Sequence, residues 1–174
     1  MPDTPPNFSL TDALELARTA HADQTDKLGV PYLEHVEAVA AGLADFDLDV
    51  QIAGMLHDVV EDSPFTLDEL AARGVSRRSL RAIELVSRNL HPDLTYDEAI
   101  DQLTASYDAT LVKISDNAHN SRPDRVAALC AVTGKPPNPR YQQARVRLYA
   151  AARPEDVAKI LDRVAPALLG ELRP

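Results

Sequence analysis

The 174-residue sequence has little cysteine, little glycine and no surplus of positive charge. Its single cysteine, Cys130, excludes an internal disulfide framework and any site that needs several cysteines, and we expect it to be a small core residue. The net charge of −9 argues against a protein that coats nucleic acid, because phosphate backbones require a basic face. A small phosphorylated ligand is compatible with this charge, since a metal and a few local cations can outweigh the global sign.

Long apolar runs are also missing. No stretch approaches the roughly 18 apolar residues of a transmembrane helix, and no basic segment followed by an apolar one stands at the N-terminus. We therefore expect a soluble, cytoplasmic protein with no membrane partner. Hydrophobic residues make up 45% of the chain, which suffices for a sizeable core, and the length suits one domain over residues 1–174.

Apolar residues recur at helical spacing through most of the chain, without a strand pattern, an internal repeat or a glycine-rich phosphate loop. The sequence thus predicts an all-α fold, a compact bundle of about ten helices, preceded by a loose leader at residues 1–8. Three helix starts have the spacing of a capping box, namely Ser9 with Asp12, Thr66 with Glu69 and Thr95 with Glu98. The expected helices cover about 10–24, 32–45, 47–63, 66–73, 76–89, 95–103, 109–120, 123–132, 140–152 and 154–169.

The segment Ala53–Asp62 is predicted to run as an apolar helix, yet it contains His57, Asp58, Glu61 and Asp62 within six residues. One imidazole and three carboxylates on consecutive turns are costly to bury unless a cation pairs with them. A divalent metal ion is the simplest such partner. The alternative is an acidic, solvated helix end.

A second polar face interrupts the apolar helix predicted at Leu111–Asn120. Asp116 and Asn120 lie one turn apart on the same side of this helix. We expect His119, between them, to pack or to point outward without a functional role. The face formed by Asp116 and Asn120 is the second candidate for a polar site inside the bundle.

Imidazole and carboxylate ligands together suit Mn, Fe or Zn better than Mg or Ca, which favour shells of oxygen alone. His57 with Asp58 is the best-founded ligand pair in the sequence. The residues alone leave open whether Asp116 joins them. They also leave open whether His35 is a ligand or a histidine engaged in an ordinary hydrogen bond.

Three blocks, in this order and spacing, resemble the HD hydrolase superfamily, and more narrowly the hydrolase domain of RelA/SpoT proteins and the stand-alone small alarmone hydrolases. The likeness covers about residues 10–125, whereas residues 126–174 match no pattern and their role stays open. The blocks are residues 20–35, 56–62 and 111–120, and Thr66–Glu69 follows the second block as in that family.

The resemblance implies that His35, His57, Asp58 and Asp116 are metal ligands, with manganese as the usual ion and other divalent transition metals as alternatives. It implies that Glu61 and Asp62 position and activate the attacking water, and a carboxylate beside a metal site can indeed accept a proton from water. The residues expected to contact a nucleotide are Lys27, Tyr32, Asn120 and Arg122.

Asp26 departs from this pattern, because the alarmone hydrolases usually have arginine at its position. An anion in place of a cation beside a polyphosphorylated nucleotide weakens the substrate assignment more than the fold or the metal. Three nearby cations could supply compensating charge, or could be solvated or paired with surface carboxylates. These cations are Lys113, Arg122 and Arg125.

The resemblance implies metal-dependent hydrolysis of the 3′-pyrophosphate of ppGpp or pppGpp, giving GDP or GTP and pyrophosphate, as part of the stringent response. One alternative is a phosphohydrolase of the same fold that acts on NADPH or a nucleoside phosphate and releases orthophosphate. Another is a nucleotide-binding regulatory module without turnover. In each case the partner is a small nucleotide, and no heptad or patch indicates an oligomeric state.

Overall fold

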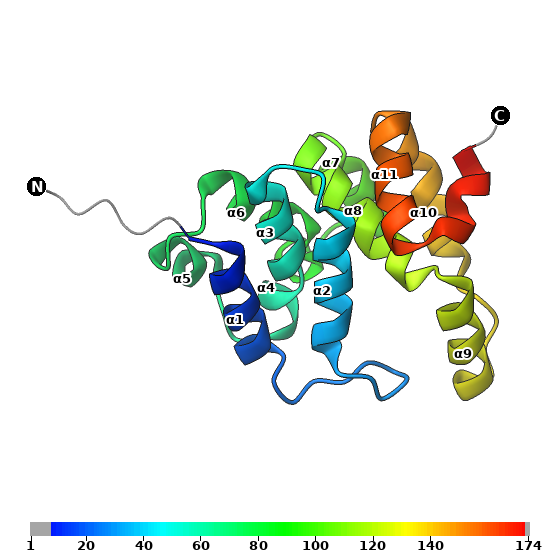
Figure 1. Ribbon diagram of the computed structural model, residues 1–174, viewed down its shortest axis with the longest axis horizontal. Helices are drawn as coiled ribbons and strands as arrows, with labels where there is room; N and C mark the ends of the chain where they lie inside the picture. The colour runs from blue at the N-terminus through cyan, green and yellow to red at the C-terminus, as the bar shows by residue number, and fades with distance from the viewer. Residues whose placement is uncertain (1–7, 173–174) are drawn as a thin grey trace, which may run out of the picture.

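The computed structural model describes residues 8–172, which form eleven α-helices and two 3₁₀ helices without a strand (Figure 1). The all-α class is therefore confirmed. The α-helices are α1 (Leu10–Ala20), α2 (Tyr32–Gly42), α3 (Leu48–Leu56), α4 (Val59–Asp62), α5 (Leu67–Ala72), α6 (Arg77–Val86), α7 (Tyr96–Leu103), α8 (Tyr107–Asn120), α9 (Pro123–Thr133), α10 (Pro139–Ala150) and α11 (Pro154–Val164). The 3₁₀ helices are η1 (Arg88–Leu90) and η2 (Pro166–Leu172).

The expected leader lies outside the described residues except for Phe8, which packs against the core. All three predicted capping boxes are present. In each, the side chain of the cap accepts a hydrogen bond from the backbone three residues later, and the acidic side chain accepts one in return. Within residues 8–172, none of the helices combines the length and the hydropathy that a bilayer span requires.

The centre of the bundle is formed by α3 and α8, and around them pack α1, α2, α6, α10 and α11. Ten of the fourteen residues of α8 and six of the nine of α3 are buried. Two glycines allow close helix crossings. A Cβ added at Gly54 would lie 2.5 Å from Leu43 Cδ1, and one added at Gly42 would overlap Ser115 and Val164. These approaches bring together α2, α3 and α8, which carry or border the expected metal ligands.

The continuous helix predicted around His57 is interrupted. The helix α3 ends at Leu56 and α4 begins at Val59, with His57 and Asp58 between them. His57 Nδ1 donates a hydrogen bond of 2.8 Å to the carbonyl oxygen of Gly54. In an unbroken helix the Asp58 N–H would bond to this same oxygen. The two polar residues therefore lie at a junction between helices rather than along one helix face.

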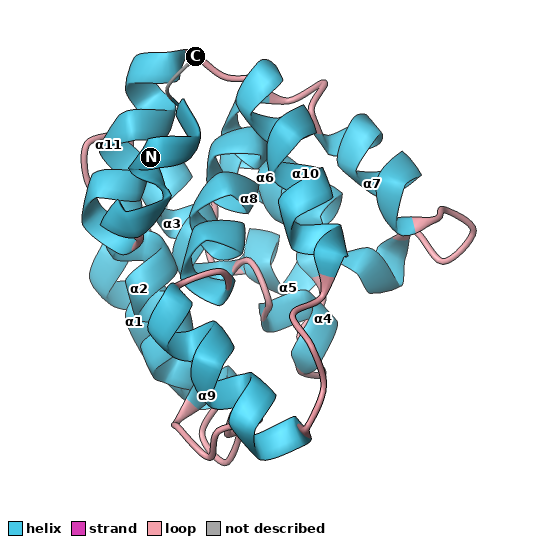
Figure 2. Ribbon diagram, turned by 90° about the vertical axis from the view of Figure 1, so that its right-hand side faces the viewer, coloured by secondary structure: helices cyan, strands magenta, loops and turns pink. Residues whose placement is uncertain are grey.

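The helix α9 is packed differently from the others. None of its residues is buried, and it projects from the bundle in Figure 1. Figure 2 shows it at the front, near the loop between α1 and α2. Cys130 lies on this helix and is only partly buried, so the expectation of a core cysteine was wrong.

Candidate metal centre

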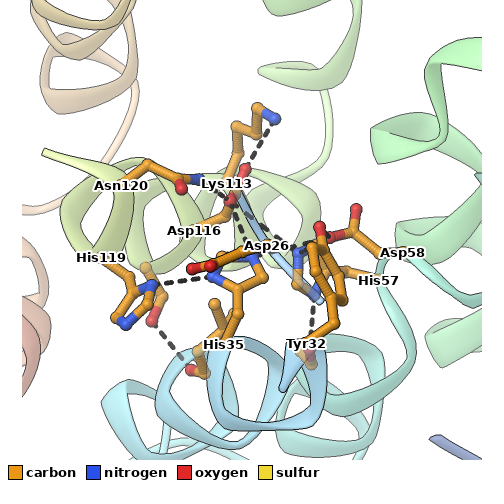
Figure 3. Close-up of polar contacts among 12 residues, drawn as sticks. Asp26, Tyr32, His35, His57, Asp58, Lys113, Asp116, His119 and Asn120 are labelled. Atoms are coloured by element: carbon orange, nitrogen blue, oxygen red, sulfur yellow. Dashed lines mark hydrogen bonds and ion pairs between the residues drawn. The ribbon is translucent and has the colours of Figure 1, made fainter. Parts of the chain in front are cut away.

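Four side chains from α2, the α3–α4 junction and α8 converge inside the bundle (Figure 3). We call these residues, His35, His57, Asp58 and Asp116, the cluster. His57 Nε2 lies 2.9 Å and His35 Nε2 lies 3.5 Å from Asp58 Oδ2. Asp116 Oδ1 lies 3.4 Å from His35 Nε2 and 3.9 Å from His57 Nε2. Ligand atoms about 2.0–2.2 Å from one ion lie about 3.0–3.5 Å apart. The two nitrogens and Asp58 Oδ2 therefore lie together as in a ligand set, and Asp116 Oδ1 lies beside both nitrogens.

Each histidine faces the cluster with Nε2 because its Nδ1 is engaged elsewhere. His57 Nδ1 donates to the Gly54 carbonyl oxygen. His57 Nε2 is buried, and although Asp58 Oδ2 lies 2.9 Å away, Nε2 forms no hydrogen bond of good geometry among the described residues. His35 Nδ1 lies 2.8 Å from His119 Nδ1. A hydrogen bond to the far nitrogen sets the tautomer that a metal-binding histidine needs. The unpartnered His57 Nε2 and this donor set fit a divalent transition metal.

His119 was expected to have no role, and the structure corrects this. Its side chain is buried and its ring is hydrogen-bonded to that of His35 (Figure 3). Burial lowers the pKa of His119 to about 4. The ring is therefore neutral at pH 7, and its Nδ1 can accept the proton of His35 Nδ1. The sequence held a signal, since His119 stands one turn after Asp116 on the same side of the helix.

Both carboxylates of the cluster are oriented by hydrogen bonds. Lys113 Nζ donates to Asp116 Oδ2 and Asn120 Nδ2 donates to Asp116 Oδ1, each at 2.7 Å. Burial opposes ionisation, but Lys113 and the two histidines of the cluster together outweigh it and hold the pKa of Asp116 well below its usual range. The hydroxyl of Tyr32 donates to Asp58 Oδ2 at 2.6 Å. The two carboxylates are therefore ionised and held in one orientation, which suits the binding of a cation.

Glu61 and Asp62 lie on α4, one turn beyond Asp58, and are exposed. Glu61 Oε2 accepts the backbone N–H of Arg88 at 2.8 Å, and Asp62 Oδ2 accepts from Gln24 Nε2 at 3.3 Å. Desolvation raises the pKa of Glu61, and the charge of Asp58 adds to this effect. A carboxylate with a raised pKa is a better proton acceptor near neutral pH.

A cavity of about 920 Å³ adjoins the cluster at Asn120. No carboxylate occurs among its lining residues within the described part of the chain, although the net charge is −9. Sequence reasoning missed three of the basic residues, which lie beyond the family blocks. The signal available was a concentration of arginine after residue 139 in an acidic chain. The cations of the lining are Lys27, Lys135, Arg140 and Arg145.

Of the four residues expected to contact a nucleotide, Lys27 and Asn120 line this cavity. The other two are directed elsewhere. Tyr32 donates its hydroxyl to a carboxylate of the cluster. Arg122 pairs with Asp124 at 2.8 Å and lines a separate cavity of about 260 Å³. The structure thus brings Lys27 and Asn120 together with the new basic residues, and not with Arg122.

Residues 13–87 match the family model described as HD domain. This segment includes His35, His57 and Asp58 of the cluster. Over this segment the chain is similar to HD domains. The resemblance seen in the three sequence blocks is thereby confirmed.

The relatives that resemble this chain are much longer than this chain. The chain is 32% identical over 119 residues to a Haemophilus influenzae protein named guanosine-3′,5′-bis(diphosphate) 3′-pyrophosphohydrolase, a match that covers 62% of this chain and 17% of that protein. It is 31% identical over 125 residues to an Escherichia coli protein named bifunctional (p)ppGpp synthase/hydrolase SpoT, covering 65% and 18%. The chain therefore spans less than a fifth of the length of these curated relatives.

One solved structure is similar over nearly the whole length of both chains. It is described as a metazoan orthologue of SpoT that hydrolyses ppGpp and plays a role in starvation responses. The two chains are 24% identical with a TM-score of 0.61, and the match covers 97% of this chain and 96% of the other. The similarity of fold therefore extends over the C-terminal helices, which match no pattern in the sequence.

Proposed function

We propose that this chain hydrolyses the 3′-pyrophosphate of ppGpp or pppGpp, giving GDP or GTP and pyrophosphate, as a cytoplasmic enzyme of a starvation response. The main support for the proposal is that one residue, Asn120, belongs to the basic cavity and also contacts the cluster. Asn120 lines the cavity and donates to Asp116 Oδ1 at 2.7 Å. The names of the relatives point to the same substrate.

The residues that would hold the ion are His35, His57, Asp58 and Asp116. Two imidazole nitrogens and two carboxylates suit manganese, iron or zinc, and we propose manganese. A divalent ion held there would supply Lewis-acid polarisation of phosphoryl oxygens and would make a nearby water more acidic. Asn120 and Lys113 keep the Asp116 carboxylate in one orientation for this role.

Glu61 and Asp62 would accept the proton of the attacking water. The water oxygen forms a bond to the phosphorus attached to the 3′ oxygen, and the bond between that phosphorus and the 3′ oxygen breaks. The 3′ oxygen leaves as the hydroxyl of GDP or GTP after taking up a proton. The raised pKa of Glu61 suits a group that gains a proton during the reaction and returns it to solvent.

The cavity suits the rest of the nucleotide. Three of its cations, Lys27, Lys135 and Arg140, can bind the 5′ phosphates, because fixed positive charges create a local field opposite to that of the whole chain. The fourth, Arg145, is paired with Glu171. Val126, Leu129 and Pro136 offer apolar surface for the base. A volume of about 920 Å³ lies within the usual range of small-molecule sites, about 300–1,000 Å³.

Product analysis tests the proposal. The purified protein is incubated with ppGpp, and separately with NADPH, in manganese or in EDTA, and pyrophosphate and orthophosphate are measured. We expect manganese-dependent pyrophosphate from ppGpp. Orthophosphate from NADPH alone would favour a phosphohydrolase of another nucleotide. Nucleotide binding without either product would favour a regulatory module.

Three variants test the assignment of roles. Asp58→Ala should lose metal and turnover together. Glu61→Gln should retain metal but lose about 100-fold or more in rate, as expected for a proton acceptor. Arg163→Gln breaks an exposed ion pair with Asp45 outside the cluster and the cavity, and should behave as the wild type. Full metal content and activity in Asp58→Ala would refute the assigned site.

A further inference from the structure

Asp26 fixes the loop between α1 and α2. Its Oδ1 accepts hydrogen bonds from the backbone N–H groups of Leu28 at 2.8 Å and Val30 at 3.0 Å. Its own N–H donates to the Val30 carbonyl oxygen at 2.8 Å. Gly29 has a φ of 79°, which a side chain would disfavour. Asp26 thus determines the conformation of the turn that carries Lys27.

The other carboxylate oxygen of Asp26 joins this loop to α9. Arg125 Nη1 donates to Asp26 Oδ2 at 2.6 Å, and the two side chains are only 15% and 6% exposed. Burial opposes ionisation, but the hydrogen bonds from Arg125 and the turn keep the pKa of Asp26 below its usual value. The negative charge that weakened the substrate assignment is therefore neutralised by Arg125, one of the cations considered for this purpose.

The helix α9 has few other contacts that could fix its position. A surface helix is usually held by burying an apolar stripe, yet no residue of α9 is buried. Its partly buried side chains instead form a wall of the large cavity, with Val126, Leu129 and Cys130 among the lining residues. Arg125 lies in the first turn of the helix, so its ion pair holds the end that adjoins the cluster.

We propose that the Asp26–Arg125 ion pair positions α9 against the α1–α2 loop and thereby sets the width of the nucleotide cavity. Lys27 follows Asp26 and Val126 follows Arg125, so the pair joins two walls of that cavity. The inference rests on the proposed function only for the identity of the ligand. Within residues 8–172 neither member of the pair hydrogen-bonds to a proposed metal ligand, although both line the smaller cavity beside His35 and His119. We therefore expect the loss of the pair to act mainly on binding.

The substitutions can separate the ion pair from the turn. Asp26→Asn removes the charge but keeps an amide oxygen that can accept the two turn hydrogen bonds. Arg125→Gln removes the cation, and the double variant completes the cycle. Arg125→Lys is a rescue variant, since Arg125 uses one nitrogen that an ammonium group can replace. Arg163→Gln is the matched control, because it breaks a two-bond ion pair with Asp45 outside the cavity.

Cys130 provides a measurement that needs no substrate, because it is the only cysteine of the chain and lines the cavity on α9. Its rate of alkylation by iodoacetamide should rise about threefold or more in Asp26→Asn and in Arg125→Gln, as expected when a locally held element loses its main contact. The double variant should resemble either single variant, Arg125→Lys should recover most of the protection, and the control should match the wild type. Equal rates in all variants, or single effects that multiply in the double variant, would overturn the proposal.

Steady-state kinetics test the consequence for the substrate. The KM for ppGpp should rise about five- to tenfold in either single variant while kcat stays within about twofold, the pattern of lost binding without loss of transition-state chemistry. Unchanged KM, or a loss confined to kcat, would overturn the positioning role while the proposed function stands. If ppGpp is not hydrolysed at all, the alkylation rates still decide the positioning role.

Discussion

Replacing His119 by leucine should weaken metal binding by about 10- to 100-fold and leave the fold intact. His119 Nδ1 lies 2.8 Å from His35 Nδ1, on the side of the ring opposite to the cluster. Leucine fills a comparable volume but offers no acceptor. The proton on His35 Nδ1 would then be buried without a partner, and the tautomer that presents Nε2 to the ion would lose its support.

The size of the effect follows from burial. His35 is 4% exposed, so water cannot easily replace the missing acceptor. Leaving a buried donor unpaired costs about 1–3 kcal/mol. At about 1.4 kcal/mol per factor of ten, that cost corresponds to about 5- to 150-fold in the dissociation constant if it falls on the metal-bound state.

Competition against a fluorescent chelator for manganese or zinc measures this constant without turnover. His119→Asn is the matched control, because the Asn Oδ1 stands close to the position of Nδ1 and remains an acceptor. It should bind metal within about threefold of the wild type if the acceptor alone matters. Wild-type affinity in His119→Leu would refute the reasoning, and so would an equal loss in both variants.

Two further predictions concern the bundle. Gly42→Ala should lower the free energy of unfolding by about 1–3 kcal/mol in urea titrations. The added Cβ would overlap Ser115 and Val164, which are buried on two other helices. An unchanged midpoint of unfolding would contradict the close helix crossing at Gly42. Asp156→Asn should cost about 1–2 kcal/mol at pH 7, because the buried carboxylate accepts hydrogen bonds from Tyr107 and two cations. Burial opposes ionisation, yet these bonds hold the pKa of Asp156 below its usual value. The stabilisation is therefore complete above the unfolded-state pKa of about 3.9 and is lost as the pH falls through the folded-state pKa. The difference in free energy of unfolding between wild type and variant should therefore close below about pH 4. A difference that persists there would exclude the ionised carboxylate as its cause.

The helix starts could be predicted from the sequence because capping is local. Thr95 and Glu98 satisfy each other's backbone groups whatever the rest of the chain does, and the box is present. The break between α3 and α4 could not be predicted in this way. At the break His57 Nδ1 donates to the Gly54 carbonyl oxygen, and apolar spacing carries no information about which donor takes that oxygen.

The convergence of the ligand candidates followed from a resemblance and not from periodicity. Helical spacing places Asp116 on a face of α8, but only the packing of α2 against α8 decides that His35 lies 3.4 Å from it. Which of the nearby cations compensates Asp26 could not be decided from the sequence for the same reason. Its partner Arg125 lies 99 residues away in the chain, so no local pattern could show that its charge is neutralised.

The helix α8 links the cluster to the cavity. Arg145 of α10 donates to Asn117 Oδ1 at 3.2 Å and to Ser121 Oγ at 2.7 Å, at the end of α8 that also carries Asp116 and Asn120. The basic wall contributed by α10 is thus anchored to the helix that carries part of the ligand set. The wall contributed by α9 has no such anchor in the core and depends on an ion pair with a loop. Differences in substrate preference among related chains should therefore arise on the α9 side, where the wall can shift without disturbing the ligands.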